Sequence, residues 1–262
     1  MIVDQTPEQD RPVDFYNQFA GMPLVLVNLD KPSLSASRNT GARRASGELL
    51  FFLDDDMVIG PDLLQNHKNV MEREHVDVVY GAISTGKDLP ETYERDTQRL
   101  DPLGFFLKSP NRKWNGMVLV TSGANTLIKR EYFLGVGGFD EKMPRMEDIE
   151  LGYRLFLAGA KIYYSALPHA IHDAASSGGT RKTQKNMTYS RLLSKIYLYQ
   201  KHFGGWTAQQ FYLLVIKNAL TYRDPISGAF FLANLRQVLW PVQTLLMLRK
   251  AHRNALLLLE NQ

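Results

Sequence analysis

The segment from Leu49 to Asp56, LLFFLDDD, places three consecutive aspartates directly after five apolar residues. A continuous apolar run of this length is typical of a strand in a sheet that is covered on both faces. Open α/β sheets bind ligands at the carboxyl ends of their strands, and acidic clusters there commonly hold a divalent cation and, through it, phosphate oxygens. A solvated acidic turn with helix-capping aspartates is the alternative, and these residues alone leave both open.

Strand-like and helix-like patterns alternate through most of the first 180 residues, which predicts an α/β fold. The order strand, helix, strand around Leu49 predicts parallel pairing. Residues 85–117 have no clean period and are interpreted as loops with a short helix. Strands are predicted at residues 2–4, 24–28, 49–53, 77–83 and 162–166, with another near residue 117, and helices at residues 35–47, from Pro61 onward and at 146–161.

A second acidic pair, Glu147 and Asp148, lies at the first turn of the predicted helix 146–161. Acidic side chains there also complement the helix dipole, so a purely structural role is open. Two histidines, His169 and His172, follow the last predicted strand. A single histidine is more often structural than a ligand, so neither one identifies a metal site by itself.

Composition sets limits on the class of protein. The 262 residues suffice for one large domain or a domain with an appendage, and the absence of cysteine excludes disulfides and thiolate zinc sites. Residues 1–180 carry 19 Lys and Arg against 25 Asp and Glu, whereas residues 181–262 carry 12 against 2. We therefore divide the chain into a domain at 1–180 and a basic, apolar helical tail at 181–262 that favours an anionic partner.

Several motifs, in this order and spacing, closely resemble glycosyltransferase family 2 of the GT-A fold. The resemblance covers roughly residues 2–175. It implies a Rossmann-like, mainly parallel sheet flanked by helices. The matching motifs are VDQT at 3–6, ASRNTGARRASGELLFFLDDD at 36–56, GGFDE at 137–141, EDIELGYR at 147–154 and the histidine at 172.

The resemblance implies a role for each of these polar residues. Asp54 and Asp56 are the outer members of a D-x-D motif, with Asp54 at the nucleotide ribose and Asp56 on Mn²⁺ or Mg²⁺ that bridges the donor diphosphate. His172 is implied as a further metal ligand. Asp148 matches the catalytic base and Glu147 its neighbour near the acceptor. The remaining implied nucleotide-binding residues are Asp4 at the base, Arg38 and Asn39 in the pocket wall, and Arg181 (or Lys182) in a loop over the diphosphate.

These residue types suit transfer of a sugar from a nucleoside diphosphate. A metal ion neutralises charge that builds on the leaving oxygen, and a carboxylate takes the proton of the acceptor hydroxyl. The predicted activity is therefore that of an inverting, metal-dependent glycosyltransferase. The predicted partners are a nucleotide-sugar and a saccharide or lipid-linked acceptor of polysaccharide biosynthesis.

The sequence departs from the family at its start, because family members have a strand and helix before the VD element. We expect strand edges without partners where that strand belongs. A truncated, non-catalytic remnant or binding module of the same fold is the alternative function.

The tail has long aliphatic runs broken by basic residues. This pattern favours helices on an anionic membrane surface or against the domain, over a spanning helix between residues 225 and 248. Nucleic acid is not expected as a partner, because the basic residues alternate with aliphatic rather than polar or aromatic ones. The expected location is cytoplasmic, peripheral on the inner face of the plasma membrane.

Overall fold

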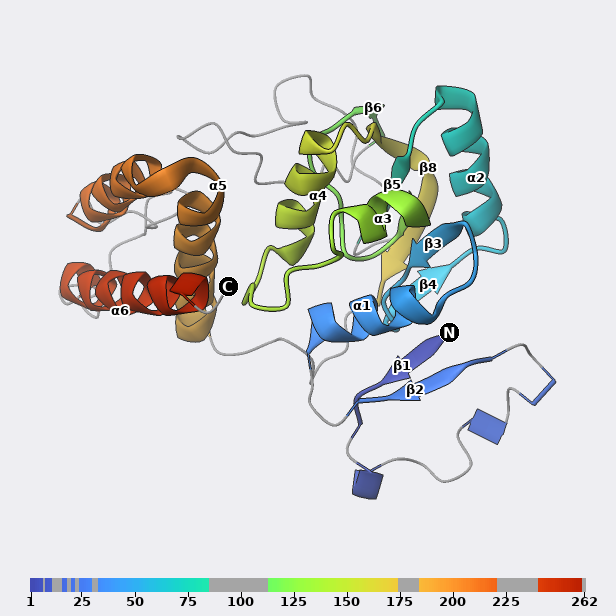
Figure 1. Ribbon diagram of the computed structural model, residues 1–262, viewed down its shortest axis with the longest axis horizontal. Helices are drawn as coiled ribbons and strands as arrows, with labels where there is room; N and C mark the ends of the chain where they lie inside the picture. Colours follow the sequence, from blue (N-terminus) through green and yellow to red (C-terminus); the bar gives the residue numbers. More distant parts are fainter. Residues whose placement is uncertain are drawn as a thin grey trace. The chain divides into compact units, whose positions relative to one another are not determined.

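The computed structural model describes residues 1–6, 8–10, 16–17, 20–21, 24–29, 33–84, 113–173, 184–220 and 240–260. These residues divide into two compact units. The first, an α/β unit, contains the described residues up to Glu141 and those from Glu147 to Asp173, and the second is helical (Figure 1). The predicted boundary at residue 180 lies outside the described residues.

The α/β unit is built on a six-stranded sheet whose path runs β3 (Leu49–Phe52), β7 (Thr126–Lys129), β5 (Val78–Ser84), β8 (Ile162–His172) and β4 (Met57–Ile59). A sixth strand, β6 (Asn115–Met117), pairs with β8 off this path. The strands β3, β5 and β8 point the same way, but β7 lies between β3 and β5 and is antiparallel to both. The sheet is therefore mixed, which corrects the expectation of a mainly parallel one.

Two N-terminal strands form a separate sheet. They are β1 (Ile2–Asp4) and β2 (Leu26–Asn28), which pair in parallel and only with each other among the described strands. The predicted parallel pairing of β2 with β3 is wrong, because β3 pairs with β7 instead. Within the described part of the chain, β1 and β3 each have one edge without a strand partner, and so do β2 and β4.

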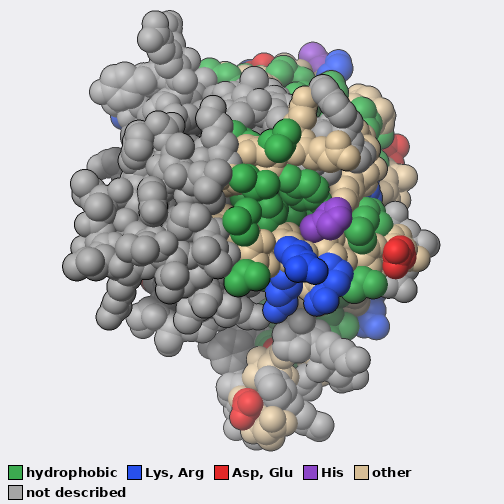
Figure 2. Space-filling view, turned by 90° about the vertical axis from the view of Figure 1, so that its left-hand side faces the viewer, with side chains coloured by type: hydrophobic (Ala, Val, Ile, Leu, Met, Phe, Trp, Pro, Cys, Tyr) green, Lys and Arg blue, Asp and Glu red, His purple; other side chains and the backbone are tan. Residues whose placement is uncertain are grey.

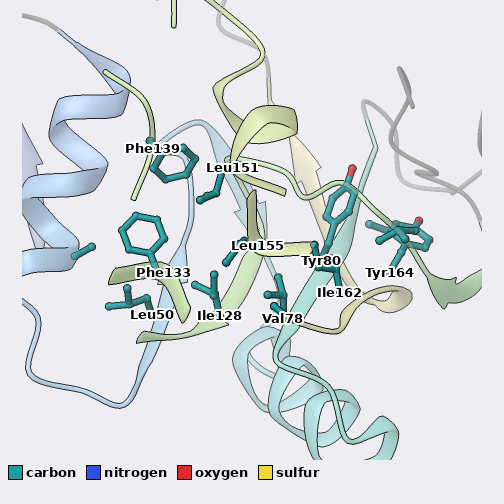
Figure 3. Close-up of a cluster of buried hydrophobic side chains, with 14 residues drawn as sticks. Leu50, Val78, Tyr80, Ile128, Phe133, Phe139, Leu151, Leu155, Ile162 and Tyr164 are labelled. Atoms are coloured by element: carbon teal, nitrogen blue, oxygen red, sulfur yellow. The ribbon is translucent and has the colours of Figure 1, made fainter. Parts of the chain in front are cut away.

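Helices cover both faces of the large sheet, as its continuous apolar strands predict. Side chains alternate along each strand, so that Val78 and Tyr80 face one core and Val79 faces the other. The first core lies under α3 (Arg130–Gly135) and α4 (Glu147–Leu157), and Figure 3 shows Phe133, Leu151 and Leu155 pointing into it. The second lies under α2 (Leu63–Glu74).

Helix α1 (Leu34–Arg44) also belongs to this unit, and hydrogen bonds to the residue before it fix its N-terminus. The Oγ of Ser33 accepts a hydrogen bond from Ala36 N (3.3 Å), which caps the helix. The side-chain amide of Gln5 holds Ser33 in place, since its Nε2 donates to Ser33 O and its Oε1 accepts from Ser33 N. A short 3₁₀ helix (Glu8–Asp10) follows β1 along the chain.

Two predicted elements have different bounds. Helix α2 begins at Leu63 with Asp62 as its N-cap, so Pro61 precedes the helix. Strand β8 continues to His172 instead of ending at 166, so both histidines lie inside it. It passes Pro168 through a bulge, in which residues 166–168 are not paired with β5 while Gly81 pairs with Ser165 and Ala82 with His169.

The helical unit contains α5 (Gln184–Leu220), which bends at Gly204 (φ 77°), and α6 (Trp240–Glu260). The predicted helices of the tail are thus present in its described residues. The two helices bury Leu192, Ile196, Phe211 and other apolar side chains against Leu248 and the alanines of α6. No described helix has a stretch both long and apolar enough to span a membrane.

A buried polar network holds the β8 bulge. The Nδ2 of Asn125 donates to the carbonyls of Ala82 (2.9 Å) and Pro168 (2.8 Å), so its Oδ1 is left to accept from His67 Nε2 (2.8 Å). His67 Nδ1 then carries no proton, and it is buried with no partner among the described residues. Burial lowers the pKa of His67 from 6.5 to about 4.

This pKa predicts a loss of stability in acid. The unfolded chain takes up the proton near pH 6.5 and the folded protein only near pH 4, so the free energy of unfolding falls as pH decreases between these values. The decrease attributable to His67 is about 3 kcal/mol. Denaturant unfolding at pH 7, 6, 5 and 4 measures it.

The variant His67→Gln should lose this part of the pH dependence. His75→Asn is the matched control, because His75 is exposed and its left-handed backbone (φ 51°) suits asparagine. An unchanged slope in His67→Gln, or an equal change in His75→Asn, would contradict the assignment.

Candidate active site

One guanidinium joins two carboxylates that come from different parts of the α/β unit. Arg38, on α1, places Nη2 at 2.6 Å from Asp54 Oδ1 and Nη1 at 3.2 Å from Glu147 Oε1. The side chain of Arg38 is only 10% exposed, and its guanidinium lies over the ring of Phe139. Gly123 makes room for it, since a Cβ there would lie 2.2 Å from Arg38 Nη1. The structure thus brings together three predicted site residues.

Asp148 lies next to this ion-pair cluster at the start of α4. Its Oδ1 accepts from Ile149 N (2.8 Å) and its Oδ2 accepts from Gly123 N (3.3 Å). Burial first, and then the negative charge of Glu147, raise the pKa of Asp148 from 3.8 to about 6, although the two backbone donors and Arg38 oppose the rise. A half-buried carboxylate with this pKa is ionised at neutral pH and still basic enough to accept a proton.

Asp56 and His172 meet at a second point of the same sheet edge. The strand β4 runs antiparallel to β8, so the residue before β4 lies beside the last residue of β8. Asp56 Oδ2 is 2.9 Å from His172 Nε2, and both side chains are partly exposed. Within the described residues no cluster of three or more His, Cys, Asp or Glu side chains is positioned to hold a metal ion.

A carboxylate and an imidazole suit Mn²⁺ better than Mg²⁺, which prefers oxygen ligands. Two protein ligands leave most coordination positions to other groups, such as diphosphate oxygens and water. The residues present therefore fit a metal that binds together with a phosphate ligand.

Asn39 holds a loop in place. Its Nδ2 donates to Phe139 O (2.8 Å) and Glu141 Oε1 (2.9 Å), and its Oδ1 accepts from Phe139 N (2.8 Å). Arg154 holds the same loop from α4 by donating to the carbonyls of Val136 and Gly138, while the buried Glu150 accepts from Arg154 at 2.6 Å. These contacts give the motif residues at 137–141 and 147–154 a structural role in shaping the wall beside Arg38.

The structure describes fewer contacts for the remaining predicted site residues. Asp4 ends β1, and its Oδ1 accepts from Thr6 N at 2.8 Å. Arg181 and Lys182 lie outside the described residues. Asp55 is exposed and its neighbours Asp54 and Asp56 are partly buried, but residues 55–56 lie in a turn between β3 and β4 rather than on the extended segment that the sequence predicted.

Sequence reasoning missed Gly123 and Phe139 as parts of the site. Gly123 supplies an N–H to Asp148 and space for Arg38, whereas the sequence pattern indicates only a turn after Ser122. Phe139 appeared as one letter of the GGFDE motif, and its contact with Arg38 joins positions 101 residues apart. Only the tertiary fold brings such pairs together.

The α/β unit therefore belongs to the class of α/β proteins that collect acidic side chains at one edge of a mixed sheet. Comparison with known proteins identifies the family. The family model "Glycosyl transferase family 2" matches residues 1–136. The chain belongs to glycosyl transferase family 2, which confirms the resemblance seen in the sequence.

Individual relatives match parts of longer proteins. The O-antigen biosynthesis protein RfbC of Myxococcus xanthus is 31% identical over 194 residues, which cover 68% of this chain and 15% of that protein. An N-acetylglucosaminyl-diphospho-decaprenol L-rhamnosyltransferase of Mycobacterium tuberculosis is 36% identical over 88 residues, 33% of this chain and 28% of that protein. The chain thus spans well under two thirds of each of these proteins.

A solved structure confirms the GT-A fold. The crystal structure of GalNAc-T7 with UDP, GalNAc and Mn²⁺ aligns with a TM-score of 0.55 at 13% identity, covering 74% of this chain and 39% of that one. Similarity at this level of identity shows the fold alone.

Helix α4 packs closely against Val120 and Thr121, shortly before Gly123 in the chain, and this contact yields a prediction. A Cβ at Gly152 would lie 2.8 Å from Thr121 N and 2.8 Å from Val120 Cα, backbone atoms that cannot rotate away. Gly152→Ala should lower the free energy of unfolding by about 1–3 kcal/mol. Gly135→Ala is the control, because nothing lies within 4 Å of a Cβ there. Equal stability of the two variants in urea unfolding would contradict the close approach of α4.

Proposed function

We propose that this protein is an inverting, metal-dependent glycosyltransferase that moves a sugar from a nucleoside-diphosphate donor to a hydroxyl acceptor. One observation carries the proposal: the Arg38 guanidinium holds Asp54 and Glu147 together, and Asp148 lies directly beside them with its pKa raised to about 6. A donor-side carboxylate and an ionised base are then adjacent, which is the arrangement that a single displacement needs.

On the donor side, Asp54 would contact the ribose, with Arg38 fixing the position of its carboxylate. Asp4 and Asn39 stay proposed nucleotide-pocket residues, as does Arg181 over the diphosphate. The side-chain amide of Asn39 already forms hydrogen bonds with Phe139 and Glu141. Its contribution would therefore come from the wall that it shapes.

Asp56 and His172 would hold Mn²⁺ or Mg²⁺, with Mn²⁺ favoured by the imidazole ligand. When bound, the metal supplies charge neutralisation on the departing diphosphate. The GalNAc-T7 structure was solved with UDP and Mn²⁺, which supports a metal-assisted donor in this fold. The protein's own part is to present a carboxylate and an imidazole at the end of β8, 2.9 Å apart.

Asp148 would act as the base. In the proposed step, the acceptor oxygen forms a bond to the anomeric carbon as the bond from that carbon to the diphosphate oxygen breaks, and the hydroxyl proton passes to an Asp148 oxygen. The nucleoside diphosphate leaves from the opposite face, so the anomeric configuration inverts. Glu147 would line the acceptor side while its Oε1 stays paired with Arg38.

The acceptor would be a saccharide or a lipid-linked saccharide of polysaccharide biosynthesis at the cytoplasmic face of the plasma membrane. The names of the two relatives, an O-antigen biosynthesis protein and a transferase acting on a diphospho-decaprenol lipid, support this class. The alternative is a non-catalytic module of the same fold.

Nucleotide binding tests the donor site. UDP, GDP and other nucleotides are each added with and without Mn²⁺, and the thermal midpoint is measured. A nucleotide at 100 times its dissociation constant adds about 2.7 kcal/mol, which should raise the midpoint by several degrees at roughly 2–4 °C per kcal/mol. The Mn²⁺-dependent part should vanish in Asp56→Ala and persist in Asp55→Ala, the exposed neighbour. No shift with any nucleotide would favour the non-catalytic module.

Turnover tests the base. Asp148→Asn should lower kcat by about 100- to 10,000-fold while keeping the nucleotide-dependent thermal shift. In the unaltered protein kcat should rise about tenfold per pH unit below pH 6 and level off above it, because only ionised Asp148 accepts the proton. Asp62→Asn, at an exposed aspartate of α2, is the control. Near-normal turnover in Asp148→Asn would remove Asp148 as the base.

A further inference from the structure

Helix α6 has two faces of different character. The inner face packs in the core of the helical unit through residues spaced by three and four, and each of them is at most 7% exposed. This spacing fills one side of a helix. The residues are Thr244, Leu248, Ala251 and Ala255.

The opposite face of α6 exposes leucines together with basic residues. Leu246 is 63% exposed and Leu257 is 50% exposed, and Leu245 and Leu256 beside them are also exposed. Between the two leucine pairs lie exposed Arg249, Lys250 and Arg253. The pairs are 11 residues apart, which is about 16 Å along a helix. The face therefore presents an apolar end, a cationic middle and a second apolar end.

The two described helices of this unit carry mostly positive charge. Helix α5 carries five Lys and Arg and no Asp or Glu, and α6 carries three against the single Glu260. Another exposed leucine, Leu213 of α5, is 67% exposed. Figure 2 looks onto the helical unit and shows hydrophobic side chains directly beside a group of Lys and Arg side chains. We call the exposed residues Leu245, Leu246, Arg249, Lys250, Arg253, Leu256 and Leu257 the α6 outer face.

A partner for this face must supply negative charge and an apolar environment over the same short distance. A second copy of the same face would bring cations against cations. The phosphates of a nucleic acid would pair with the basic residues but would leave the leucines exposed to water. The surface of an anionic bilayer supplies both, because its phosphates lie at the level of the cationic groups and its acyl chains begin within about 5–10 Å.

We propose that the α6 outer face binds an anionic lipid surface, with α6 lying in the plane of the headgroups. The leucines enter the boundary of the acyl chains, and Arg249 and Arg253 bind lipid phosphates. Lys250 lies over the ring of Tyr189, so it contributes charge from a fixed position. The proposal stands apart from the proposed catalysis, because it uses no residue of the active site.

Sedimentation with lipid vesicles tests it, without nucleotide or metal. At about 0.1 M salt the full chain should bind vesicles of phosphatidylcholine with about 30% phosphatidylglycerol far more tightly than phosphatidylcholine alone, and raising the salt should weaken binding. Each basic residue near an anionic surface contributes about fivefold, so Arg249→Gln with Arg253→Gln should lower the partition coefficient about 30-fold. Leu246→Ser with Leu257→Ser should also lower it.

Two further variants make the test specific. Arg44→Gln with Lys161→Gln removes the same charge from exposed positions of the α/β unit and should bind as the unaltered protein does. Arg249→Lys with Arg253→Lys keeps the charge and should retain binding. This variant tests the role of charge even if the glutamine variant fails to fold. Equal binding to neutral vesicles, or no effect of the α6 substitutions, would overturn the proposal. Dimers that dissociate in the leucine variant, without vesicle binding, would assign the face to a second copy instead.

Discussion

The guanidinium of Arg38 is the interaction on which the arrangement of the active site depends. Asp54 follows β3 and Glu147 begins α4, and both carboxylates lie within 3.2 Å of this one cation. Two carboxylates that share one cation would repel each other strongly in its absence where water is scarce. Without Arg38, Asp54 and Glu147 would therefore move apart or one would take up a proton. The ring of Phe139 and the missing Cβ of Gly123 leave the guanidinium little freedom to move. The ion pairs therefore fix the position of Asp54 relative to Glu147, and so of the proposed donor side relative to the proposed acceptor side.

The directions of the strands decide which acidic groups meet. Because β3, β5 and β8 point the same way, the end of β3 with its aspartates and the end of β8 with His172 share one edge of the sheet. The strand β4 then returns antiparallel along β8 and brings Asp56 to His172. The bulge at Pro168 is what allows β8 to reach that far, and Asn125 and His67 hold it. A buried histidine of α2 thus supports the contact between Asp56 and His172.

The sequence predicted those features of the fold that depend on local pattern. Alternation and apolar runs located β3, β5 and α4, and the order of short motifs identified the family before any contact was known. It could not predict that β7 enters between β3 and β5, because strand order depends on long-range pairing that carries no local signal. It ended β8 too early, because a proline normally stops a strand and the hydrogen bonds that permit the bulge come from Asn125, over 40 residues away. The roles of Asn39 and Arg154 in holding the 136–141 loop likewise depend on contacts between distant segments.

The chain passes from the helical unit into the α/β unit directly before the first turn of α4. Residues 142–146 belong to the helical unit, where Met143 lies in the core and Arg145 N donates to Ser194 Oγ at 3.0 Å. Met146, with a positive φ of 64°, turns the chain, and Glu147 and Asp148 follow at once in the α/β unit. Within the α/β unit the two carboxylates are held by Arg38, which pairs with Glu147, and by Gly123, whose N–H donates to Asp148. Because a base must lie within hydrogen-bond reach of the proton that it removes, these contacts tie the proposed chemistry to the positions of α1 and of Gly123 within the α/β unit.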